Sequence, residues 1–119
     1  MEQCDVKGCM GAGQKHHIVF RSQGGLNIEL NYISLCIYHH SVGKEAVHNN
    51  RAFDLELKRA LQERYFELFE KEQYTIAEIS ELIRYNKNRL ARRMKSVPQR
   101  AGKYGKEDII RFLMGGKLY

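Results

Sequence analysis

The chain has 119 residues, 43% of them apolar, and a formal net charge of +6. This length allows one compact core or two very small units, so it excludes a large substrate cavity, and the apolar content excludes an intrinsically disordered chain. No stretch approaches the roughly 18 uninterrupted apolar residues of a membrane span, and the N-terminal residues lack a secretory signal pattern, so we expect a cytoplasmic protein that contacts no membrane.

The first 36 residues predict a loop followed by two short strands. Residues 1–15 are rich in Gly, Cys and Lys and have little apolar periodicity, so something other than packing must hold them. Residues 17–20 favour a strand, the paired glycines within 22–25 favour a turn, and residues 31–36 favour a returning strand. The pattern predicts a β-hairpin or a long loop between two short strands.

Residues 52–74 predict a long amphipathic helix. Apolar residues recur there at spacings of three and four and form one stripe: Phe53, Leu57, Leu61, Tyr65, Leu68 and Phe69. The opposite side carries Glu56, Glu63, Glu67, Glu70 and Glu72. Because an acidic face repels phosphates, we expect this helix to link the two ends of the protein and not to bind nucleic acid.

The segment after this helix predicts two short helices joined by a tight turn. Thr75 and Glu78 fit a capping box that opens a helix over 76–83. A second helix over 88–95 would end before Pro98. Two short helices with a tight turn are typical of a helix-turn-helix.

The last twenty residues predict a basic flexible loop over 100–105 and a final amphipathic helix over 107–114 that ends at Gly115 and Gly116. Charge is distributed unevenly along the chain, because residues 1–54 hold five Lys/Arg and five Asp/Glu, which leaves the whole +6 to the remainder.

The residues from 84 to 106 include nine bases and no acid. The bases are Arg84, Lys87, Arg89, Arg92, Arg93, Lys95, Arg100, Lys103 and Lys106. A run of this length without a balancing carboxylate predicts a polyanionic partner, which points to nucleic acid. The alternative interpretation is the solvated basic face of an ordinary helical cap.

The three cysteines predict a metal site. They are odd in number and would be reduced in the cytoplasm, so a disulfide framework does not explain them. Cys4-x4-Cys9 and Cys36-x2-His39 form two pairs of ligands, which can close a tetrahedral zinc site with no open position for substrate. We therefore expect a structural zinc, and the alternative is three unrelated thiols and a surface histidine.

All five histidines fall in the same N-terminal half of the chain. His16-His17-Ile18, Arg21-Ser22-x-Gly24-Gly25, Asn31 and Leu35-Cys36-x2-His39-His40 together resemble the HNH endonucleases over roughly residues 4–50. The resemblance implies a ββα-metal nuclease core and an enzyme that hydrolyses a DNA phosphodiester with one catalytic metal ion.

By this resemblance, His17 is the general base, His16 and His40 bind the catalytic metal, His48 is a third ligand, and Asn31 braces the loop. The chemistry agrees, because a neutral imidazole that stays off the metal can take a proton from water near physiological pH. Asn31 is uncharged and would orient His17 without competing for the proton, for example by holding its backbone or its ring.

The chain departs from the common HNH pattern at three positions. Many members have Asp at the position of His16; an all-imidazole set favours Mn²⁺, Ni²⁺, Co²⁺ or Zn²⁺ over Mg²⁺, and all five ions stay candidates. Many members also have Cys-x2-Cys in place of Cys36-x2-His39, so the structural zinc site would be of the Cys3His type. His48 follows His40 by eight residues, which is farther than in related members.

Together these patterns predict an α+β fold in three parts: a zinc-stabilised ββα-metal core over 1–54, a linking helix over 55–74, and a helix-turn-helix-like segment over 75–119. The last segment loosely resembles the small DNA-binding domains appended to phage and mobile-element nucleases. Its expected contacts to double-stranded DNA are Arg89, Arg92, Arg93, Lys95, Arg100 and Lys103.

The predicted function is a metal-dependent DNA endonuclease or nickase, and a homodimer would allow it to cut both strands. Two alternatives stay open. One is a zinc-stabilised DNA-binding protein without catalysis, which would need neither His17 nor Asn31. The other is a nuclease that acts on RNA or serves as a toxin.

Overall fold

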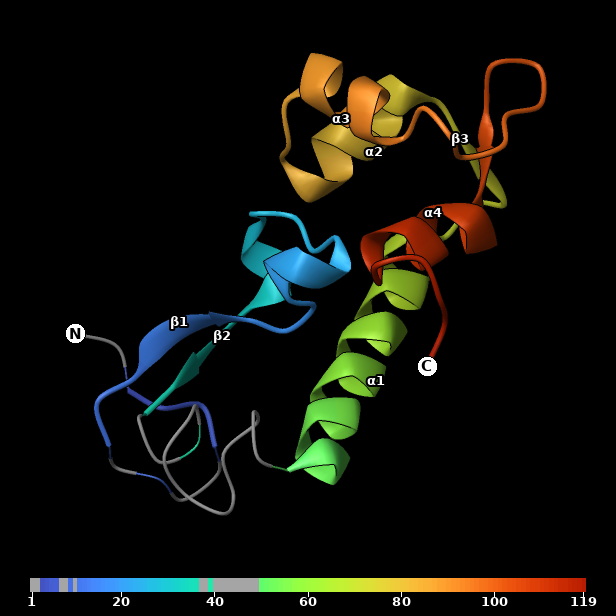
Figure 1. Ribbon diagram of the computed structural model, residues 1–119. Coiled ribbons are helices and arrows are strands. Elements are labelled where there is room, and N and C mark those ends of the chain that lie inside the picture. The colour runs from blue at the N-terminus through green and yellow to red at the C-terminus, as the bar shows by residue number, and fades with distance from the viewer. Residues whose placement is uncertain (1–2, 7–8, 10, 37–38, 40–49) are drawn as a thin grey trace.

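The computed structural model describes residues 3–6, 9, 11–36, 39 and 50–119 (Figure 1). It has an α+β fold, and its described part contains four α-helices and two small two-stranded antiparallel sheets. This confirms the predicted α+β class. No helix within the described ranges is long and apolar enough to cross a membrane.

The first sheet pairs β1 (Gln14–His17) with β2 (Tyr32–Leu35), with His17 opposite Tyr32. The second strand was predicted within one residue at each end. The prediction of a strand over 17–20 was wrong, because the ladder ends at His17. The backbone N–H of Val19 donates to the side chain of Asn31 (2.8 Å) instead of to a neighbouring strand, and the chain turns inward there.

The loop between these strands contains two short 3-10 helices, η1 (Arg21–Gln23) and η2 (Glu29–Asn31). Gly24 adopts a φ of 94°, a left-handed conformation that favours glycine and closes η1. In Figure 1 this loop lies between the first sheet and the C-terminal helices.

The helix α1 (Arg51–Leu68) begins at Asn50, whose side chain accepts from the backbone N–H of Phe53 at 3.1 Å. The predicted extension of this helix to residue 74 was wrong, because the helix ends at Leu68 and Phe69 is its C-cap. The Tyr74 hydroxyl accepts from the backbone N–H of Lys71 at 2.6 Å, and the Tyr74 ring packs edge-on against Phe69 with centroids 5.2 Å apart. These two contacts stabilise a reversal of the chain after Phe69, so the helix does not continue.

Residues 73–74 form β3 (Gln73–Tyr74), which pairs with β4 (Tyr104–Gly105). The prediction of a flexible loop over 100–105 was therefore wrong. Arg100 and Lys103 exchange backbone hydrogen bonds of 2.8 and 3.1 Å around Ala101 (φ 54°) and Gly102 (φ 77°). Two consecutive residues with positive φ make a tight hairpin turn that orders this segment.

Three short helices complete the C-terminal part: α2 (Ile76–Ile83), α3 (Lys87–Arg93) and α4 (Lys106–Leu113). The predicted capping box of α2 is confirmed, since Thr75 Oγ1 accepts from the backbone N–H of Glu78 (3.2 Å) and Glu78 Oε1 accepts from that of Thr75 (2.9 Å). α2 and α3 are joined by a tight turn at Arg84, which has a φ of 55°.

The main apolar core joins distant parts of the chain. Ile18, Val19, Leu26 and Ile28 from the loop of the first sheet pack in one cluster with buried residues of α1 to α4. A second, much smaller cluster contains Cys4, Leu35 and Cys36. The helix α1 runs across residues 54 and 55, where the sequence suggests a boundary between units, and its buried apolar side chains, Leu61 and Tyr65, belong to the main core.

Candidate functional site

The predicted ligands of the structural metal lie together. The ligand atoms of Cys4, Cys9, Cys36 and His39 all lie within 4.8 Å of one another. The Sγ atoms of Cys9 and Cys36 are 3.7 Å apart, and Nδ1 of His39 lies 3.5 Å from Sγ of Cys4 and 3.1 Å from Sγ of Cys36. The three cysteines are free thiols. This cluster can hold a metal ion, as the spacing predicts.

Two of the distances, 3.7 Å between the Sγ atoms of Cys9 and Cys36 and 3.5 Å between Sγ of Cys4 and Nδ1 of His39, match the edges of a tetrahedral site. Metal–sulfur bonds of roughly 2.3 Å would place two sulfurs about 3.8 Å apart, close to the separation of Cys9 and Cys36. Gly11 lies beside the cluster, and its backbone N–H donates to Sγ of Cys9 at 3.4 Å. A Cβ at Gly11 would lie 2.9 Å from Cβ of Cys36, so only glycine fits beside the cluster without a shift.

The cluster favours the thiolate of Cys36 but not that of Cys9: the backbone N–H of Gly11 lowers the pKa of Cys9, yet burial and the contacts with Cys36 and Cys4 outweigh it and raise that pKa. Burial raises the pKa of the Cys36 thiol, but hydrogen bonds from the backbone and ring of His39, from Cys9 and from Cys4 outweigh it and lower the pKa from 9.0 to about 6. At neutral pH Cys36 is therefore ionised, which is the form of cysteine that binds metal.

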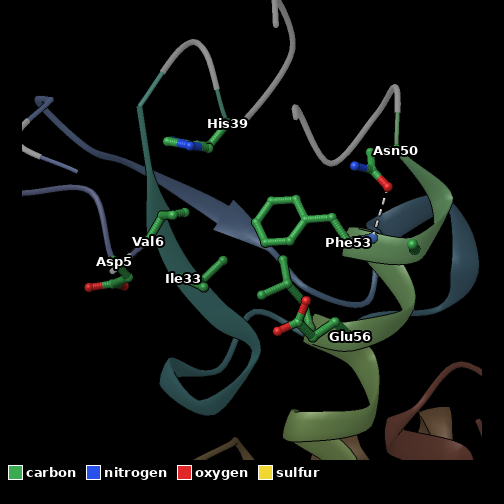
Figure 2. A pocket seen from close by; sticks show the side chains of 9 residues that line it. Asp5, Val6, Ile33, His39, Asn50, Phe53 and Glu56 are labelled. Atoms are coloured by element: carbon green, nitrogen blue, oxygen red, sulfur yellow. Dashed lines mark hydrogen bonds between the residues drawn. The ribbon is translucent and has the colours of Figure 1, made fainter. Parts of the chain in front are cut away.

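A cavity of about 510 Å³ separates the cluster from the start of α1 (Figure 2). Val6, Ile33 and His39 line one side, and the ring of Phe53 points toward them from the helix. The rings of His39 and Phe53 lie edge-on with centroids 6.4 Å apart. Holding His39 in place therefore also holds the wall against which the first turn of α1 packs.

The two adjacent histidines of β1 have different environments. His16 is buried (5% exposed), and its ring packs edge-on against Phe20 with centroids 5.5 Å apart. His17 is half-buried, and its ring tilts against Tyr32 at 4.7 Å. Successive strand residues point to opposite faces, so the two imidazoles cannot lie side by side on one face. Neither belongs to the metal cluster.

Asn31 fixes the loop that follows β1. Its side chain is 1% exposed, accepts from the backbone N–H of Val19 at 2.8 Å, and donates to the carbonyls of Val19 and Leu26, both at 3.0 Å. Gly25 is needed beside it, because a Cβ there would lie 1.8 Å from the carbonyl oxygen of Val19. Asn31 thus holds the loop backbone, and neither the backbone nor the ring of His17 is among its partners.

The ring of His17 is held by Asn27 instead, through a hydrogen bond of 2.8 Å between Nε2 and Oδ1. Sequence reasoning missed Asn27. The one clue is its place four residues before Asn31 in the same loop, which does not distinguish it from an ordinary turn residue. Sequence reasoning also missed Lys58, which is 0% exposed and lies under this loop, with Nζ 4.3 Å from the ring centroid of Phe20.

The remaining predicted ligands of a catalytic metal, His40 and His48, lie outside the described residues. Among the residues that are described, Cys4, Cys9, Cys36 and His39 are the one group of three or more ligands close enough to share an ion.

The predicted DNA contacts are all exposed. Arg92 and Arg93 lie three and four positions after Arg89 on α3, so they are its neighbours on the helix surface, and Lys95 follows the helix. Arg100 and Lys103 flank the tight turn before β4.

Comparison of the chain with protein-family models, with curated proteins and with solved structures gives no match.

Proposed function

We propose that this protein is a metal-dependent DNA endonuclease or nickase of the HNH type, with His17 as the base that activates water. The observation that carries the proposal is the position of His17. It ends β1 outside the four-ligand cluster, half-exposed, with its Nε2 bonded to Asn27. His17 is therefore not a ligand of that cluster, and its ring is held in a fixed orientation at the end of the strand.

The loop geometry supports a positioning role for the two asparagines. Oδ1 of Asn27 can only accept, so the bonded Nε2 of His17 carries the proton and Nδ1 is the ring nitrogen that can accept one from water. Asn31 has its three hydrogen bonds with the loop backbone, which fixes the segment that carries Asn27. Both residues thus restrict the orientation of the imidazole, and neither takes a proton itself.

The catalytic ion would be held by His16 with His40 and His48, and Mg²⁺, Mn²⁺, Ni²⁺, Co²⁺ and Zn²⁺ are its candidates. When bound, such an ion supplies Lewis-acid stabilisation of charge on the phosphate and the leaving oxygen. The exposed bases of α3 and the hairpin turn would hold the DNA backbone, so affinity should fall as salt concentration rises.

The test is nicking of supercoiled plasmid with each of the five ions in turn. His17→Ala should lower the rate by about 100-fold or more, the usual contribution of a general base. Gln14→Ala is the matched control, because Gln14 is exposed on the same strand. Undiminished nicking by His17→Ala, or intact plasmid with every ion, would contradict the proposal.

The second candidate is a zinc-stabilised DNA-binding protein without catalysis. It is supported by the four-ligand cluster and the exposed bases of α3, since a binding protein needs a stable fold and a basic surface but no general base. It predicts salt-sensitive binding of plasmid that is never cut, so the same assay separates the two.

A further inference from the structure

A cavity of about 350 Å³ lies where the loop after β1 meets the turn and helix α3. It is lined by Arg21, Gly25 and Asn27 from the loop and by Tyr85 and Arg93 from the C-terminal part. Figure 1 shows the loop lying next to the pair of short helices. Residues some seventy positions apart in the chain therefore share one pocket, which neither part could form alone.

The side chains in this cavity are suited to an anion. Two guanidinium groups, a phenol and an amide supply donors, and no carboxylate is among the described residues that line the cavity. Within the described part of the chain, neither Arg21 nor Arg93 takes part in an ion pair. Guanidinium groups match phosphate oxygens in geometry as well as in charge, so a tetrahedral oxyanion is the ligand that this set fits best.

The cavity is also connected to His17. Asn27 lines it and accepts the hydrogen bond from Nε2 of His17 at 2.8 Å. A ligand in the cavity is therefore one side chain away from the imidazole. At roughly 30 Å³ per water molecule, about 350 Å³ exceeds the space that a single phosphate needs, so part of its sugar-phosphate chain can enter with it.

We propose that this cavity binds a backbone phosphate of the nucleic acid strand. This phosphate would be adjacent to the scissile phosphate, which is attacked by the water molecule that His17 activates. The inference rests on the proposed function for the identity of the ligand. It assigns Arg93 a role different from that of its neighbours on α3, because Arg93 would join the DNA-binding segment to the catalytic loop and fix the register of the strand.

The first experiment uses inorganic phosphate as the probe, so it does not depend on cleavage. Phosphate is titrated into ¹⁵N-labelled protein while the amide signals of Gly25 and Asn27 are recorded. We expect saturable shifts that weaken at least fivefold in Arg21→Gln and in Arg93→Gln. Arg59→Gln is the control, because it removes the same charge from an exposed position on α1 that does not line the cavity, and it should change the affinity less than twofold.

A second titration replaces phosphate with a 20-base-pair duplex. The same signals should shift in the wild type, and prior addition of duplex should abolish the response to phosphate. Equal phosphate affinity in all variants, or a response to phosphate that the duplex leaves intact, would overturn the inference; the latter would mean that the cavity takes free phosphate. If the duplex binds there and plasmid stays uncut, the proposed catalysis fails while this site stands.

Discussion

Different interactions stabilise the two ends of the molecule. The N-terminal residues around Cys4 and Cys36 bury only a small cluster, and their ligand atoms converge on a point that a metal can occupy. The C-terminal part buries a continuous apolar core that includes Leu61, Tyr65 and Ile109, each 0% exposed. Apolar burial therefore supplies folding free energy at the C-terminal end, whereas the N-terminal end buries little apolar surface and has four ligand atoms that can hold a metal ion.

Removal of the metal should have the largest effect and should affect the two ends differently. Cys36→Ser, or a strong chelator, should unfold the segment around the cluster, because structural zinc contributes on the order of 10 kcal/mol. The core of α1 to α4 should persist. Amide exchange would show lost protection in β1 and β2 with retained protection in α4. His17→Ala should still bind one structural metal, and uniform loss of protection would contradict the division.

Asn31→Ala should give the next largest effect. It leaves three backbone groups of Val19 and Leu26 without their buried partner, at roughly 1–3 kcal/mol each, so we expect a loss of about 4 kcal/mol in the free energy of unfolding. Urea denaturation measures it. Asn27→Ala, which changes an exposed side chain in the same loop, should cost less than about 0.5 kcal/mol. Similar losses in both variants would count against the bracing role.

The buried Lys58 tests how the core accommodates a charge. Its Nζ lies 2.5 Å from Oδ1 of Asp54, and their side chains are 1% and 17% exposed. Asp54→Asn removes the carboxylate that neutralises the buried lysine and should lower the free energy of unfolding by about 3 kcal/mol. Lys58→Met leaves a carboxylate that water can reach, so its loss of stability should be smaller. Thermal unfolding of both variants checks the order, and a reversed order would contradict this account.

A surface change in the C-terminal part should matter less. Thr75→Ala removes the cap of α2 and should lower stability by about 1 kcal/mol, measured by urea denaturation, while Thr75→Ser keeps the hydroxyl and should stay near the wild type. No difference between the two variants would mean that the cap contributes nothing.

The smallest expected effect concerns acid. Hydrogen bonds from Lys71 and from the backbone of Thr75 lower the pKa of Glu78 from 4.5 to about 2. The Glu78 carboxylate therefore stabilises the folded state above pH about 4.5, and this contribution fades as the pH falls toward 2. Glu78→Gln should flatten that part of the curve of stability against pH, with a loss at pH 7 below that of Thr75→Ala. An unchanged curve would contradict the shift.

Elements with regular local patterns were the most predictable from sequence. The capping box located the start of α2, and the spacing of Cys4, Cys9, Cys36 and His39 predicted a cluster that the structure brings together. The capping box was predictable because its two residues lie three positions apart. The cluster was predictable because four metal ligands have to converge on one point.

What the sequence did not reveal depends on contacts between distant residues. The end of α1 depends on Tyr74 packing against Phe69, and the burial of Lys58 depends on Phe20 and Asp54. The hydrogen bond between Asn27 and His17 likewise needs the loop to fold back on β1. Periodicity and composition carry no information about such pairs, because neither partner is unusual in its own segment.

The shared core has a consequence for how this chain could change through recombination. Ile18, Val19, Leu26 and Ile28 are covered by helices encoded much later in the gene. A crossover near residue 54 that attached an unrelated C-terminal segment would leave these four side chains against water. A replacement for the C-terminal part must therefore bring a matching apolar surface with it, so the two ends can be inherited only together.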